Sequence, residues 1–149
     1  MPKISLIIPC YNEEKNIKPL FEQVKKLQKK IDLELIVVNN GSVDKTEKEI
    51  NIFKKKIKNI KVVKVMKNIG FGNGVKKGLK RSTADIICYT HGDLQIKMNN
   101  ILIAYKIYKS QKKKNIFIKG LRVNRSFFDN FFTLAMSIFN SLIFRKSCL

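Results

Sequence analysis

Four short clusters of polar and glycine residues hold most of the chemistry that this 149-residue chain can offer. Each cluster directly follows a short apolar run. The clusters are Pro9-Cys10-Tyr11-Asn12-Glu13, Asn39-Asn40-Gly41-Ser42, Asn68-Ile69-Gly70 and His91-Gly92-Asp93. Glycine lets a backbone approach a phosphate, an amide can pair with a base edge, and a carboxylate can hold a divalent cation that bridges a diphosphate. Together the residue types suit a nucleotide, although each cluster alone is also typical of an ordinary turn with a helix cap.

The apolar runs before the clusters are expected to be strands of one parallel sheet. They cover residues 3–8, 33–38, 61–66 and 84–90, and Pro9 is expected to close the first. Segments with apolar residues at helical spacing separate them, which predicts an α/β fold with right-handed crossovers. Because the carboxyl ends of parallel strands meet at one edge, the four clusters should share a single rim.

Further elements follow from caps and periodicity. Asn12 is predicted to cap the first helix, and Asp44 with Glu47 has the spacing of a capping box for the second. A helix over 98–110 and a strand over 115–119 are expected next. No domain linker is visible in the sequence.

The C-terminal part is rich in phenylalanine. Residues 127–144 contain six Phe, and their polar residues recur every three or four positions, which predicts an amphipathic helix with a wide apolar face. Asp129 and the polar stripe argue against a bilayer span, whereas flanking basic residues favour a helix lying on a membrane surface. Packing of this helix over the sheet as core is the alternative.

Net charge and cysteine usage exclude few classes of function. The formal net charge of +20 would attract nucleotide phosphates, nucleic acid or anionic lipid, but a coding bias toward Lys, Ile and Asn explains it equally well. Cys10, Cys88 and Cys148 form no CxxC pair, which argues against a disulfide framework or zinc cluster and favours a reducing cytosol. The run before Pro9 is neither a signal peptide nor a membrane span.

The order of the motifs is more specific than any one of them. The strings SLIIPCYNEEKNI, ELIVVNNGSVDKT and NIGFGNGVKKGLKRSTADIICYTHGDLQ resemble the three successive motifs of family 2 glycosyltransferases, in particular the polyprenyl-phosphate branch that includes dolichyl-phosphate mannose synthase. The resemblance covers roughly the first two-thirds of the chain. IKGLRVNR and the Phe-rich helix resemble the acceptor-side segment of that branch more loosely.

The resemblance implies a Rossmann-like GT-A fold, a nucleoside-diphosphate sugar as donor and Mg²⁺ or Mn²⁺ as cofactor. It divides the chain into a nucleotide-sugar-binding core, 1–120, and a basic loop with an interfacial helix, 121–149, within one domain that continues further in the family. By motif position the nucleotide-binding residues would be Pro9, Tyr11, Glu13, Asn39, Asn40, Asn68 and Gly70.

Two positions depart from the family pattern. Asp93 matches the last Asp of the DxD motif and would bind the metal, with Gln95 beside it as the second catalytic residue. His91 stands where the first Asp is usual, and Asn39 stands where a base-contacting Asp is common. A neutral imidazole can ligate Mn²⁺ and an amide can still pair with a base, so both substitutions are compatible with binding. His91 could equally close the strand end without touching the metal.

The implied reaction is an inverting sugar transfer to a polyprenyl phosphate at the cytoplasmic face of a membrane, with the chain bound peripherally through 127–144. Arg122 and Arg125 are candidates for holding the acceptor phosphate, since guanidinium groups match phosphate oxygens, or they belong to a solvated basic loop.

Three other functions are compatible with parts of the sequence. A truncated or inactive relative would bind nucleotide without transferring sugar. A basic nucleic-acid-binding α/β domain would fit the charge but leaves the aligned motifs unexplained, so no nucleic acid partner is expected. A dinucleotide oxidoreductase is the weakest, because Gly70, Gly72 and Gly74 do not form GxGxxG.

Overall fold

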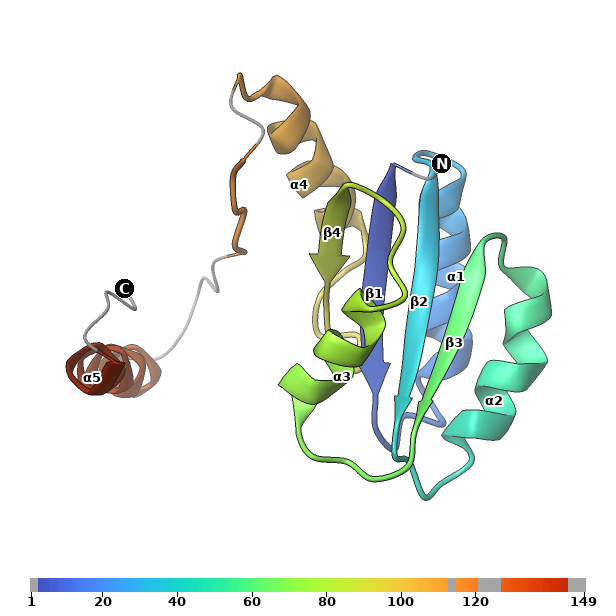
Figure 1. Cartoon of the computed structure of the whole chain (residues 1–149), viewed down its shortest axis with the longest axis horizontal. Coiled ribbons are helices and arrows are strands. Elements are labelled where there is room, and N and C mark those ends of the chain that lie inside the picture. Colours follow the sequence, from blue (N-terminus) through green and yellow to red (C-terminus); the bar gives the residue numbers. More distant parts are fainter. Residues whose placement is uncertain (1–2, 113–114, 121–126, 145–149) are drawn as a thin grey trace. The chain divides into compact units, whose positions relative to one another are not determined.

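The computed structural model describes residues 3–112, 115–120 and 127–144 of the chain (Figure 1). It divides into two units, 1–114 and 115–149, which we describe separately. The sequence-based division at residue 120, and the assignment of both parts to one domain, stay predictions.

The first unit is built on a four-stranded parallel sheet in the order β3-β2-β1-β4 (Figure 1). The strands are β1 (Ile4–Cys10), β2 (Leu33–Asn40), β3 (Ile60–Val65) and β4 (Ile86–Tyr89). Every residue of β1 and β2 is buried, as their continuous apolar runs predict for central strands covered on both faces. The predicted α/β fold with a parallel sheet is confirmed.

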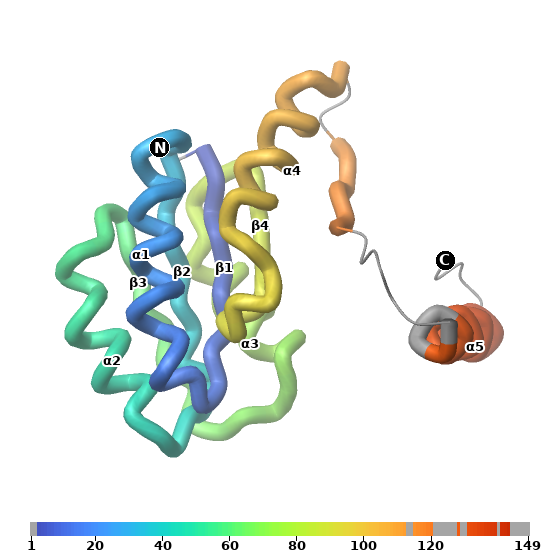
Figure 2. The backbone as a smooth tube through the Cα atoms, turned by 180° about the vertical axis from the view of Figure 1, so that it is seen from behind, coloured from blue at the N-terminus to red at the C-terminus, as the bar shows by residue number. Residues whose placement is uncertain are grey.

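Helices cover both faces of the sheet. They are α1 (Ile17–Gln28), α2 (Thr46–Phe53) with the short 3₁₀ helix η1 (Lys54–Lys56), α3 (Phe71–Leu79) and α4 (Asn99–Ser110). One core joins α1, α2 and α4 to the face that carries Leu6, Ile8 and Val37 (Figure 2). On the other face α3 packs on Ile7 and Val38, so closely that a Cβ at Gly78 would clash with Cγ2 of Ile7.

Pro9 does not close β1, contrary to the prediction. The strand continues to Cys10, and Pro9 stays in register with Val38 of β2. The backbone carbonyl of Ile7 accepts a hydrogen bond from the backbone N–H of Thr90, so the backbone polar groups of Ile7 face the β4 side. Two residues further along β1, the backbone nitrogen of Pro9 faces the same side, but at a level beyond the last residue of β4. The missing N–H of proline therefore removes no bond between strands.

The predicted helix caps are also wrong in detail. Asn12 lies five residues before α1, with a positive φ of 55°, and its side chain accepts a hydrogen bond from the backbone of Val43 instead. Asp44 does accept the backbone N–H of Thr46, but Glu47 pairs with Lys64 rather than completing a capping box. Tertiary contacts compete here with the local bonds that the sequence pattern suggests.

A buried polar cluster fixes the connection between α3 and β4. Glu34 is 3% exposed and receives hydrogen bonds from Ser5, Thr83 and Lys61, with a 2.7 Å ion pair to Lys61 Nζ. Burial opposes ionisation of this carboxyl, but the bonds from Lys61, Ser5 and Thr83 outweigh it and hold its pKa at about 2. Charge on Glu34 therefore favours the folded state.

Replacing Glu34 with Gln is expected to lower the free energy of unfolding at pH 7 by about 2 kcal/mol, because Lys61 loses its counterion. The folded-state pKa is depressed, so this contribution is complete above the ordinary value of 4.5 and disappears as the pH falls toward about 2. Urea unfolding at pH 7 and pH 2.5 measures both effects. Glu47→Gln, which breaks an exposed pair, is the control and should cost less than about 1 kcal/mol. Equal losses from the two variants would contradict the prediction.

The second unit contains α5 (Phe127–Phe144), at the bounds predicted from the sequence. Residues 115–120 form no strand, so the predicted strand over 115–119 is wrong. A single short apolar run needs a neighbouring strand to pair with, and Phe117 is 76% exposed. Within the described residues, no helix combines the length and apolarity needed to cross a bilayer.

Candidate nucleotide-binding site

The carboxyl ends of the four parallel strands bring the four polar clusters to one edge of the sheet (Figure 1). At this edge Cys10 of β1 is in register with Asn39 of β2, and Asn40 with Val65 of β3. The single rim predicted from the sequence is therefore present, and its loops follow β1, β2, β3 and β4.

The β1 and β2 loops are joined by hydrogen bonds. The backbone N–H of Asn12 donates to Ser42 Oγ at 3.1 Å, and that of Glu13 donates to Thr46 Oγ1 at 2.7 Å. Asn39, which is 3% exposed, accepts the N–H of Ser42 through Oδ1 at 3.1 Å. The side chain of Asn39 thus shapes its own loop.

The β2 loop is joined to the β3 loop through Asn40. Its Nδ2 donates to Asn68 Oδ1 at 3.2 Å and to the carbonyl of Gly70 at 3.1 Å, while Asn68 Oδ1 also accepts the N–H of Gly70. Gly41 has φ +78°, and a Cβ there would lie 2.5 Å from the backbone N of Asn68. Only glycine fits this approach.

The β3 and β4 loops meet through two stacked rings. The ring centroids of Phe71, the first residue of α3, and His91 are 4.1 Å apart at an interplanar angle of 12°. The β4 loop in turn lies against the end of β1, since a Cβ at Gly92 would be 2.8 Å from Cys10 Sγ. The four loops therefore form a closed ring of contacts.

The remaining predicted residues occupy different positions on this ring. Pro9 is buried under α3, where a Cβ at Gly74 would lie 2.8 Å from its own Cβ. Tyr11 is 45% exposed. Glu13 is half-buried, and its carboxylate accepts a hydrogen bond from the side chain of Asn16. Gly70, with φ 104°, precedes α3, whose first N–H groups are available for an anion.

The β4 loop presents the two candidate metal ligands. Asp93 is half-buried and its Oδ1 accepts the backbone N–H of Gln95 at 3.1 Å, whereas no bond is recorded for Oδ2 within the described residues. His91 and Gln95 are exposed. The described residues contain no group of three His, Cys, Asp or Glu able to hold a metal by itself. The single carboxylate of Asp93 is compatible with a cation that arrives on a diphosphate, because Mg²⁺ is usually bound by one or two carboxylates plus phosphates and water.

Burial keeps the thiol at the rim protonated. Together with a smaller effect from the nearby negative charge of Glu13, it raises the pKa of Cys10 to about 12. The thiolate, which is the nucleophilic form, is therefore disfavoured at neutral pH.

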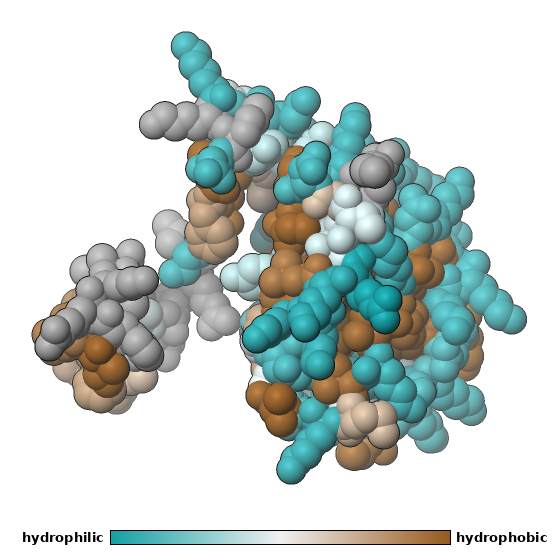
Figure 3. Space-filling model, in the orientation of Figure 1, coloured by the Kyte–Doolittle hydropathy of each residue, from teal (hydrophilic) through white to brown (hydrophobic). Residues whose placement is uncertain are grey.

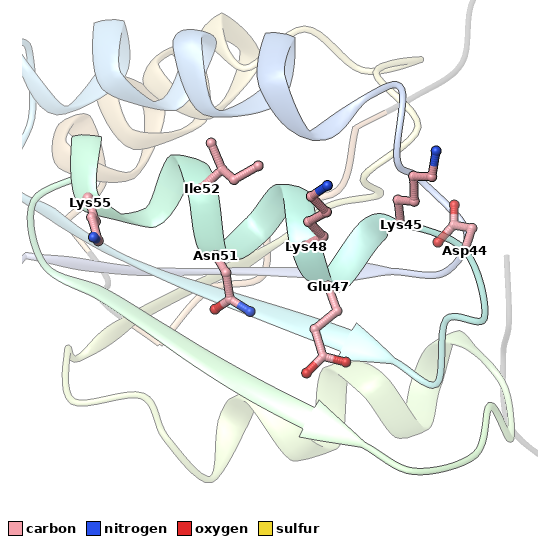
Figure 4. Close-up of a pocket in the computed structure, with 7 residues that line it drawn as sticks. All are labelled: Asp44, Lys45, Glu47, Lys48, Asn51, Ile52 and Lys55. Carbon is pink, nitrogen blue, oxygen red and sulfur yellow. The ribbon is translucent and has the colours of Figure 1, made fainter.

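A surface hollow lies along α2 (Figure 4). It has a volume of about 840 Å³, and none of the predicted nucleotide-binding residues lines it. Its lining residues come from α2 and the segments that flank it: Asp44, Lys45, Glu47, Lys48, Asn51, Ile52 and Lys55.

Sequence reasoning missed several residues that assemble the rim. Ser42 and Thr46 join the first two loops, and Phe71 supports His91. Ser42 was visible within its cluster, but nothing in the sequence distinguishes Phe71 from a core residue of α3. Arg122 and Arg125 lie outside the described residues.

Comparison with known proteins identifies the family. The family model of glycosyl transferase family 2 matches residues 5–147, nearly the whole chain. The chain belongs to this family. The match includes residues of both units.

Individual relatives and solved structures agree with this family assignment. A dolichol-phosphate mannosyltransferase from Pyrococcus furiosus is 31% identical over 93 residues, which are 62% of this chain and 26% of the relative. The crystal structure of TarS 1–349 from S. aureus has a TM-score of 0.64 at 25% identity, covering 83% of this chain and 37% of the TarS 1–349 chain. The structure of a mannosyltransferase from Pyrobaculum calidifontis, in complex with GDP-Man and Mn²⁺, has a TM-score of 0.62 at 18% identity, with 74% and 33% covered, and supports the fold alone.

The chain is shorter than these relatives. It spans between 26% and 63% of the lengths of the first curated relatives that it matches. The family match and the structural likeness establish the family and the GT-A fold. Because the chain covers only part of these relatives, its donor, acceptor and reaction are proposals.

Proposed function

We propose that this chain forms the nucleotide-sugar-binding part of a glycosyltransferase that transfers a sugar, with inversion, to a polyprenyl phosphate at a membrane surface. The observation that carries the proposal is the closed ring of contacts among the four loops. It gathers the motif residues of family 2 at one edge of the sheet, where ligands bind in open parallel α/β folds.

The donor nucleotide would be held by the β1, β2 and β3 loops. Tyr11 offers an exposed ring beside the base, while the buried Asn39 and Asn40 hold the loops that form the wall of the pocket. Pro9, Glu13, Asn68 and Gly70 complete this wall by position. Gly70 suits the sugar-phosphate side because a Cβ there would meet nothing within 4 Å, which leaves space beside its Cα for a ligand.

The diphosphate would lie toward the β4 loop. His91 and Asp93 are the residues that would hold a Mg²⁺ or Mn²⁺ ion, with Gln95 beside them. When bound, the cation supplies charge that offsets the negative charge on the departing nucleoside diphosphate. The P. calidifontis mannosyltransferase, which shares the fold, was solved with GDP-Man and Mn²⁺, and the proposed cation is of the same kind.

In the reaction an acceptor phosphate oxygen forms a bond to the anomeric carbon while the bond from that carbon to the diphosphate oxygen breaks. Attack from the opposite face inverts the anomeric configuration. The acceptor phosphate is already an anion at neutral pH, so no strong general base is required. Arg122 and Arg125 are proposed to hold it, because guanidinium groups pair with phosphate in a fork geometry.

Membrane contact would come from α5. Its large apolar side chains are exposed, including Phe128, Phe132 and Leu142 at 72%, 65% and 73%, and hydrophobic residues are visible on its surface in Figure 3. We propose that the chain is peripheral at the cytoplasmic face, where the lipid phosphate and the nucleotide sugar meet. The relative named for dolichol phosphate supports a lipid acceptor.

Replacing both Phe131 and Phe132 with Ser is expected to weaken binding to lipid vesicles at least about tenfold, because two exposed rings would no longer enter the interface. Co-sedimentation with vesicles containing anionic lipid measures the change. Ile52→Ser on α2, which removes a side chain that is 47% exposed elsewhere, should leave binding unaltered. Unchanged sedimentation of the double variant would show that α5 does not contact the bilayer.

The proposed donor is tested by isothermal titration with UDP-, GDP- and dTDP-sugars, with and without Mn²⁺. We expect one nucleotide series to bind, and only in the presence of the cation. Binding without transfer to a polyprenyl phosphate would indicate a nucleotide-binding relative that lacks catalysis. If no nucleotide binds and DNA or RNA binds in a salt-dependent manner, the proposal is wrong and the nucleic-acid alternative replaces it.

A further inference from the structure

We propose that Phe71 is a positioning residue for the metal site, which holds the His91 imidazole so that a ring nitrogen ligates the cation on the diphosphate. The inference rests on the proposed function and deepens it. It assigns a role to a side chain that the family motifs do not mark, and it chooses metal ligation for His91 over simple closure of the strand end.

The stack itself is the first support. The two rings are nearly parallel, at 12°, with centroids 4.1 Å apart, and Tyr89 adds a third ring at 6.4 Å from Phe71. No hydrogen bond holds the His91 side chain within the described part of the chain, and the residue is exposed. An exposed imidazole would otherwise rotate among rotamers, so the contact with Phe71 selects its orientation.

Phe71 is able to do this because α3 is itself held firmly. Gly74 lies against Pro9 and Asn40, and Gly78 lies against Ile7 and Val38, with no room for a Cβ at either position. Phe71 is the first residue of this helix, so its ring rests on an element docked on the sheet rather than on a free loop.

The chemistry of the stacked ring fits a ligand. Stacking uses the face of the imidazole and leaves its edge, which carries both nitrogens, free of Phe71. Asp93, two residues further, supplies an oxygen. A nitrogen donor is better suited to Mn²⁺ and later transition metals than to Mg²⁺, so the site should prefer Mn²⁺ over Mg²⁺.

His91 is the single histidine of the chain, which makes the test specific. In protein without metal, the imidazole proton signals should show a ring-current shift that is lost in Phe71→Leu and kept in Phe71→Tyr. Phe53→Leu is the matched control, since Phe53 is another partly buried ring at the end of a helix and, among the described residues, stacks on no other ring. Signals that do not move in Phe71→Leu would overturn the positioning role, whatever the chain binds.

The ligand role is tested with ¹⁵N-histidine-labelled protein, Mn²⁺ and either UDP or GDP. Pulsed electron paramagnetic resonance should detect coupling between Mn²⁺ and ¹⁵N, and Phe71→Leu should weaken both the coupling and, by about tenfold, Mn²⁺ binding, while Phe71→Tyr retains them. Nucleotide-dependent Mn²⁺ binding without ¹⁵N coupling would overturn this inference and leave the proposed function intact. Absence of Mn²⁺ binding with UDP and GDP, and also with dTDP in a repeat of the experiment, would overturn both.

Discussion

Replacing Asp93 with Asn is expected to weaken Mn²⁺-dependent nucleotide-sugar binding about 100-fold, with a loss of sugar transfer at least as large. The substitution removes the one negative charge that the candidate metal site contributes, and a neutral amide is a poor substitute for a carboxylate ligand of a hard cation. Asp93 is only half-buried and accepts one recorded hydrogen bond, from the backbone N–H of Gln95, so stability should change little. Titration calorimetry and thermal unfolding separate the two effects.

Asp85→Asn is the matched control for this variant. Asp85 is exposed and directly precedes β4, whereas Asp93 follows it, so both substitutions remove one charge at opposite ends of the same strand. Equal loss of binding in the two variants would indicate a general effect of net charge. Full binding by Asp93→Asn would remove Asp93 from the metal site.

Replacing Gly41 with Ala should lower the free energy of unfolding by about 3 kcal/mol. The residue has φ +78°, a conformation that costs an L-residue about 1–2 kcal/mol, and the new Cβ would lie 2.5 Å from the backbone N of Asn68, which cannot move away like a flexible side chain. The β3 loop must shift to relieve the contact, so nucleotide binding should fall as well. Urea unfolding and calorimetry measure the two effects.

Gly72→Ala provides the comparison for Gly41. Gly72 lies within α3, and a Cβ there would meet nothing within 4 Å, so alanine should be neutral or stabilise the helix by up to about 1 kcal/mol. The same substitution should therefore lower the free energy of unfolding at Gly41 and leave it unchanged or raise it at Gly72. This difference separates the close approach at Gly41 from a general intolerance to alanine. Stabilisation by Gly41→Ala would refute the proposed close contact.

The sheet and most helices could be predicted from periodicity alone. The run over 33–38 marks β2, which extends two residues further to Asn40, and the helix over 127–144 has the predicted bounds. In long segments the secondary structure is determined by which residues are buried, and the spacing of the apolar residues indicates this directly. The shared rim of the four loops could be predicted as well, because parallel strands place their carboxyl ends at one edge of the sheet.

The errors occurred where a tertiary contact competes with a local preference. Asn12 has the residue type of a helix cap, but its side chain bonds to Val43, thirty-one residues away in sequence. Pro9 is expected to end a strand, yet its missing N–H faces a side where β4 has already ended. The strand over 115–119 lacked a partner, which no local pattern reveals.

The candidate site was only partly visible in the sequence for the same reason. The motif order indicated Tyr11, Asn68 and Asp93, but the stack of Phe71 on His91 joins residues from two loops and has no local signal. Asn39 and Asn40 were selected as ligand-binding residues, and their burial and hydrogen bonds give them a structural part in the rim besides the proposed contact.

The four loops form a closed ring of contacts, so the stability of each loop depends on its neighbours. Each loop is held from two sides, so a substitution at one junction loosens the neighbouring junctions as well. Double-mutant cycles between Gly41 and Gly92, which lie at different junctions and make no recorded contact with each other, should therefore give a non-zero coupling energy. The rim would then respond to mutation as one cooperative unit, and a ligand that stabilises any single junction would tighten them all.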